Sequence, residues 1–104
     1  MVYPGRMADT SHALSTSVLK ERLEAAFPSL LEELTQLVAI PSVSSDPAHA
    51  ADVERSAEHI RERFAALGLE AKVLRETAAD GTEGKPALVA HTPHIEGAPT
   101  VLLY

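Results

Sequence analysis

The sequence predicts an α/β fold in which two amphipathic helices precede three strands. Apolar residues recur every three or four positions over residues 17–40 and again over 48–67, which is the spacing of one helix face. Three shorter apolar runs follow, at residues 69–75, 87–90 and 101–104. Helices followed by strands in this order are typical of the opening of a layered α/β domain.

The first helix is expected over residues 17–40, after a polar stretch without periodicity, 1–16, that we interpret as a disordered tail. Pro28 interrupts the pattern because proline lacks a backbone donor and clashes with the preceding turn, so we expect a kink there or a new helix with Pro28 in its first turn. Pro41 should end the helix, since the residue before a proline avoids the α region. The apolar face consists of Leu19, Leu23, Phe27, Leu30, Leu34 and Leu37.

The second helix is expected over residues 48–67, after a turn and helix-start segment at 42–47. Gly68 then follows as the left-handed residue that closes the helix. Most other positions of this helix are charged. The apolar face consists of Val53, Ala57, Ile60, Phe64 and Leu67.

The three strand candidates differ in pattern. Residues 69–75 are apolar at alternate positions, which predicts a half-exposed edge strand, and 77–85 predict a flexible, hairpin-like loop before the second strand at 87–90. Residues 101–104 are apolar at every position, which is typical of a strand buried on both faces. Two helices on one side cannot cover both faces of such a strand, so we expect a larger sheet and a chain that is incomplete at its C-terminus.

Composition excludes several classes of function. The 104 residues carry a formal charge of −6, which argues against nucleic acid and anionic membranes as partners. The absence of cysteine excludes disulfides, thiolate metal sites and a cysteine nucleophile. No signal-peptide core or membrane-length apolar stretch is present, so we expect a cytoplasmic protein; Met7 offers an alternative start to Met1.

The sequence contains five histidines, the residue type most often found as a metal ligand. His91, His94 and Glu96 are residue types that suit zinc, but their spacing matches no helical metal motif and Pro93 prevents a helix from bringing them together. We expect a polar loop there and keep a weak metal site as an alternative. His49 and His59 are nearly three helical turns apart, so they cannot share an ion and are expected to be exposed. The remaining one, His12, falls in the expected tail and has no assigned role.

Two further segments contain residue types found in active sites. Ser42, Ser44 and Ser45 lack a Gly-x-Ser-x-Gly turn and are better explained by helix capping and turn hydrogen bonds. Residues 80–85 contain glycines and a lysine, but Pro86 stands where a phosphate-binding loop has its hydroxyl residue. The sequence therefore assigns no catalytic, cofactor-binding or metal-ligating residue to this chain.

Four segments are informative together: LTQLVAIPSVSSDP at 34–47, ERSAEHIRERFAALGLEAKV at 54–73, GKPALVAH at 84–91 and APTVLLY at 98–104. In this order and spacing they resemble the N-terminal part of the zinc-dependent exopeptidases of the carnosinase, aminoacylase and acetylornithine-deacetylase family. The likeness is greatest to carnosinase-type dipeptidases. It spans residues 17–104, which would then be the N-terminal portion of a mixed-sheet catalytic domain.

The resemblance implies a parent enzyme that holds two zinc ions, hydrolyses dipeptides or N-acyl amino acids, and dimerises through a lid domain. In that family the strand matching residues 100–104 leads into Gly-His-x-Asp-x-x-Pro, whose histidine is the first zinc ligand. No such position exists in this chain, so we carry over no site residue and expect the chain alone to be inactive. The alternative is a small standalone α/β interaction module whose strand at 101–104 docks on the sheet edge of a partner.

Overall fold

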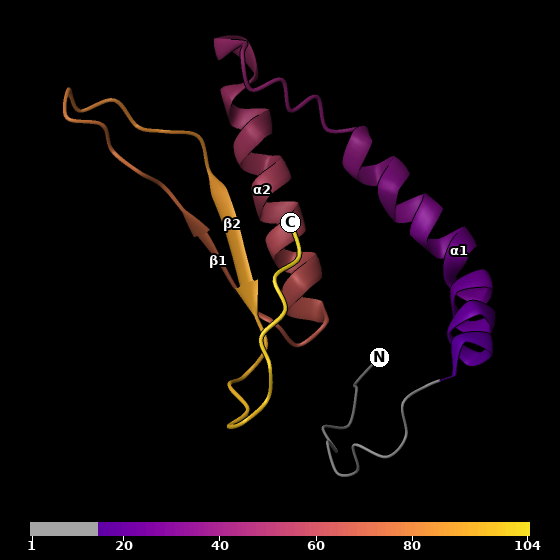
Figure 1. Cartoon of the computed structure of the whole chain (residues 1–104). Helices are drawn as coiled ribbons and strands as arrows, with labels where there is room; N and C mark the ends of the chain where they lie inside the picture. The colour runs from indigo at the N-terminus through magenta and orange to yellow at the C-terminus, as the bar shows by residue number, and fades with distance from the viewer. Residues whose placement is uncertain (1–14) are drawn as a thin grey trace.

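The computed structural model describes residues 15–104, so most of the expected tail, including His12, lies outside the described residues. Two helices are followed by a two-stranded antiparallel sheet, which confirms the predicted α/β class and the order of helices before strands (Figure 1). The elements are α1 (Thr16–Val38), the 3₁₀ turn η1 (Pro47–His49), α2 (Ala50–Ala66), β1 (Glu70–Leu74) and β2 (Ala87–His91).

Helix α1 is one continuous helix with Pro28 inside it, so the expectation of a new helix beginning at that proline is wrong. Because Pro28 has no backbone N–H, only the hydrogen bond to the carbonyl of Glu24 is lost. The residues around it are mostly strong helix formers. Nearby, the hydroxyl of Ser29 donates to the carbonyl of Ala26 at 2.8 Å. One missing hydrogen bond is therefore not enough to divide a helix of 23 residues.

Helix α1 and the turn η1 each begin with a side-chain cap that satisfies a free backbone donor, whereas α2 has no side-chain cap of its own. Ser15 Oγ accepts from the backbone N–H of Val18 at the start of α1, at 3.4 Å. Before η1, Asp46 Oδ1 accepts from the N–H of Ala48 at 2.9 Å, and Pro47 occupies the first position of the turn. Because this first turn is 3₁₀, α2 itself begins at residue 50 rather than at the expected 48.

The predicted left-handed residue after α2 is confirmed. Gly68 has φ +81°, and its N–H donates to the carbonyl of Ala65 at 2.9 Å. The N–H of Leu69 donates to the carbonyl of Phe64 at 3.1 Å. This pair of bonds is the Schellman arrangement, and it turns the chain directly from α2 into β1.

Strand β1 pairs with β2 in a register that sets Ala71 opposite Ala90 and Val73 opposite Leu88. These four residues are half-buried and alternate with exposed ones, as predicted for a strand with one covered face. Helix α2 contacts both strands, whereas α1 contacts α2 and neither strand. One face of the sheet is thus covered by a single helix.

The connection between the strands is a hydrogen-bonded hairpin loop. Gly81, at φ +84°, donates its N–H to the carbonyl of Ala78, and the carbonyl of Thr82 accepts from the N–H of Ala78, both at 2.9 Å. Gly84 N–H donates to the carbonyl of Glu76 at 2.7 Å. The hairpin-like loop predicted at 77–85 is therefore confirmed.

The third predicted strand is not formed. Residues 101–104 have no regular secondary structure, and each is at least 77% exposed. A strand needs a hydrogen-bonded neighbour, and no backbone in the described residues pairs with this segment. The sheet here is accordingly two-stranded and antiparallel, without the parallel pairing that a mixed sheet requires.

No side chain among residues 15–104 is fully buried, so the described residues enclose no hydrophobic core. In this same range no helix combines the length and apolar character needed to cross a bilayer. What holds the elements together is the half-buried contact of α2 with the sheet, reinforced by ion pairs between elements.

Candidate functional site

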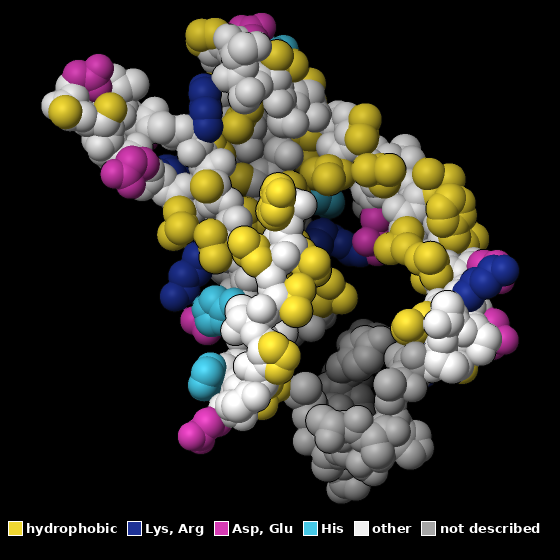
Figure 2. Space-filling view, in the orientation of Figure 1, with side chains coloured by type: hydrophobic (Ala, Val, Ile, Leu, Met, Phe, Trp, Pro, Cys, Tyr) yellow, Lys and Arg dark blue, Asp and Glu magenta, His cyan; other side chains and the backbone are white. Residues whose placement is uncertain are grey.

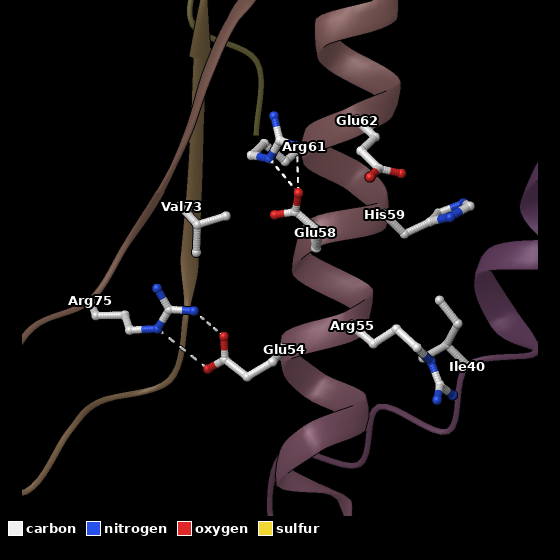
Figure 3. A pocket seen from close by; sticks show the side chains of 9 residues that line it. All are labelled: Ile40, Glu54, Arg55, Glu58, His59, Arg61, Glu62, Val73 and Arg75. Atoms are coloured by element: carbon white, nitrogen blue, oxygen red, sulfur yellow. Dashed lines mark hydrogen bonds and ion pairs between the residues drawn. The ribbon is translucent and has the colours of Figure 1, made fainter.

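A charged groove of about 610 Å³ lies between α2 and β1 (Figure 3). Residues of α2 provide most of its lining, and β1, the residue after it and the segment after α1 provide the rest. The lining residues are Ile40, Glu54, Arg55, Glu58, His59, Arg61, Glu62, Val73 and Arg75.

One ion pair crosses the groove from α2 to the end of β1. Arg75 Nε donates to Glu54 Oε1 at 3.4 Å, and Arg75 Nη2 also donates to Glu54 Oε2. The hydrogen bond to Glu54 raises the pKa of Arg75 above its ordinary value. The two residues are 21 positions apart, so this pair ties the far end of the strand to the helix.

A second ion pair lies along α2. Arg61 Nε donates to Glu58 Oε1 at 2.8 Å, and its Nη2 contacts the same oxygen. This hydrogen bond lowers the pKa of Glu58; desolvation opposes it, and the charges of Arg61 and Arg75 each lower the pKa by a smaller amount. A carboxylate held ionised in this way is a poor general acid, and its pairing with Arg61 also occupies it as a base.

The other polar groups of the groove do not complete a reactive arrangement. His59 and Glu62 have no hydrogen bond or ion pair within residues 15–104, and Figure 3 shows His59 directed away from β1. The lining contains no serine, threonine or lysine that could act as a nucleophile. The groove is therefore best described as a salt-bridged contact that joins α2 to β1.

The structure does not assemble the metal site considered at residues 91–96. His91 Nδ1 hydrogen-bonds the carbonyl of Thr92 at 3.1 Å, and its Nε2 lies 3.6 Å from Glu70 Oε2 across the sheet. No group of three or more His, Asp or Glu side chains in the described residues could hold a metal ion. His94 and Glu96 are exposed residues of the loop that follows β2, as the polar-loop interpretation predicts.

His49 does not lie exposed on a helix as expected. It ends η1 just before α2, is half-buried, and its Nδ1 lies 2.9 Å from Asp52 Oδ2. Arg55 Nη2 contacts the other oxygen of Asp52 at 2.8 Å, so three side chains of successive turns form one cluster. His59 is half-buried as well. The sequence signal was available, because His49 and Asp52 are three positions apart at a helix start.

The serine cluster has no catalytic surroundings. Ser42, Ser44 and Ser45 are exposed in the segment between α1 and η1, and the cap predicted for this region comes from Asp46 instead. In the hairpin loop, Asp80 Oδ1 accepts the N–H of Thr82 at 2.9 Å, which lowers the pKa of Asp80. That loop closes on itself and offers no phosphate cradle.

Exposed apolar surface is the most prominent feature that the ion pairs leave unexplained. Figure 2 shows hydrophobic side chains uncovered along α1 and along the segment at the C-terminal end of the chain. Seven large side chains of α1 are 45–72% exposed: Leu19, Leu23, Phe27, Leu30, Leu31, Leu34 and Val38. A second, largely apolar groove of about 720 Å³ lies between the end of α2, β2 and residues 92–103.

No family model, curated protein or solved structure matches this chain.

Proposed function

We propose that this chain is the N-terminal portion of the catalytic domain of a zinc-dependent exopeptidase of the carnosinase, aminoacylase and acetylornithine-deacetylase family, nearest to carnosinase-type dipeptidases. On this proposal the parent enzyme is cytoplasmic, dimerises through a lid domain and hydrolyses dipeptides or N-acyl amino acids with two zinc ions. The 104 residues themselves contribute scaffold and no catalytic group.

The observation that carries the proposal is the uncovered apolar surface on α1 and on residues 101–104. Large apolar side chains of a soluble domain are normally removed from water, because each fully buried one stabilises the fold by roughly 1.5–3 kcal/mol. Here none of the described side chains is fully buried, and the apolar face of α1 contacts no strand. A larger domain that packs on these surfaces accounts for both facts.

Three of the four segments that resemble the family coincide with regular elements of the structure, and the fourth, 98–104, does not. The segment 34–47 forms the end of α1 and the entry to α2, and 54–73 runs through α2, its glycine cap and into β1. Residues 84–91 lead into and form β2. The mixed sheet, with residues 100–104 as a paired internal strand, is part of the proposal, because that segment has no partner among residues 15–104.

The side chains of residues 15–104 do not fit a zinc site. Asp52, which lies beside His49, is already paired with Arg55. Glu70 lies beside the exposed His91, and these two side chains alone do not make a metal site. Zinc needs three or four converging ligands, and no such set exists in the described part of the chain. No step of hydrolysis is assigned to any residue here.

The coding sequence beyond the Tyr104 codon tests the proposal. We expect an in-frame Gly-His-x-Asp motif, and we expect a protein extended through it and the following domain to hydrolyse dipeptides when zinc is supplied. Replacement of the motif histidine by alanine should abolish that hydrolysis, while purified residues 1–104 with zinc should show none. Chelator-sensitive hydrolysis by residues 1–104, or a stop codon directly after Tyr104, would contradict the proposal.

One observation favours a second candidate, a small interaction module. Residues 101–104 are apolar and exposed, and their backbone has no hydrogen-bond partner among residues 15–104. The segment is therefore available to pair with the sheet edge of another protein. This candidate requires a chain that is stable and monomeric by itself. A sharp, reversible unfolding transition of monomeric residues 1–104 would favour the module over the larger enzyme.

A further inference from the structure

We draw no further inference here: the strongest candidate, the unpartnered apolar face of α1 between Leu19 and Val38, carries nothing beyond the proposed function because nothing in residues 15–104 shows what covers it.

Discussion

The apolar face of α1 should control how strongly this chain associates with itself when it is purified alone. The perturbation is a triple variant, Leu23→Glu, Leu30→Glu and Leu34→Glu, which places three carboxylates along that face. These leucines are 59%, 45% and 54% exposed, and α1 packs against no strand. Replacing them therefore removes little packing within the chain and mainly removes surface that another copy could cover.

The size of the effect follows from the exposed fractions. Full burial of a leucine side chain stabilises by roughly 1.5–3 kcal/mol, so covering the exposed half contributes about 1 kcal/mol for each residue and about 3 kcal/mol for the three. A free-energy change of 1.4 kcal/mol corresponds to a tenfold change in Kd, so the triple variant should weaken self-association by about 100-fold.

Sedimentation equilibrium over the micromolar range measures this Kd directly. The matched control is Ala25→Glu, Ser29→Glu and Gln36→Glu, which adds the same three charges on the opposite, exposed side of α1. Circular dichroism should show similar helix content in both variants. A wild-type chain that stays monomeric throughout, or a Kd that rises equally in the two variants, would refute the reasoning.

Three smaller changes test individual contacts. Gly68→Ala should destabilise the protein by about 1–2 kcal/mol in a denaturant titration, because a side chain is disfavoured at a left-handed φ even though no atom lies within 4 Å of the added methyl group. Gly68→Asn should lose less stability. Equal stability of the wild type and both variants would argue against the role of Gly68 as the helix cap. Glu54→Gln should speed amide hydrogen exchange in β1 by breaking the pair with Arg75, and unchanged exchange would mean that the pair does not hold the strand. The pKa of Glu58 is lowered in the fold, so its stabilising contribution is present above the ordinary carboxyl pKa and is lost as pH falls through the folded-state pKa. In an NMR titration Arg61→Gln should move the Glu58 midpoint upward, and an unmoved midpoint would exclude Arg61 as the cause.

Local patterns predicted the elements whose causes lie close together in the sequence. The half-buried positions of α2, its closing Gly68 and the alternation in β1 all follow from side chains within a few residues of one another. Of the two outcomes predicted at Pro28, a kink or a new helix, the new helix is not found, because the effect of a proline depends on the residues around it. The helix propensities of the many residues on both sides together outweigh one absent hydrogen bond. Their combined contribution cannot be judged from Pro28 alone.

The charged groove could not be predicted because it depends on tertiary position. Glu54 and Arg75 are individually ordinary surface residues, and only the antiparallel return of the chain through Gly68 brings the end of β1 beside the start of α2. The pair that links the two helices, Glu33 with Arg63, is equally remote in sequence. By contrast, the pair between Glu58 and Arg61 has helical spacing and was open to prediction.

The two strands differ in a way that indicates where a larger sheet would grow. On the face away from α2, β1 presents Glu70, Lys72 and Leu74, and the charged groups of the first two lie 3.5 Å apart, whereas β2 presents Ala87, Val89 and His91. Charges on a strand discourage pairing at its free edge, so β1 is suited to be the outer strand. On the proposed function, additional strands would therefore join beyond β2. Figure 1 shows α1 on the side of α2 away from both strands, and on the proposed function its uncovered apolar face would pack over the added strands. The exposed surface of α1 and the unpaired residues 101–104 would then belong to two facing layers, helix and sheet, that bury each other's apolar side chains.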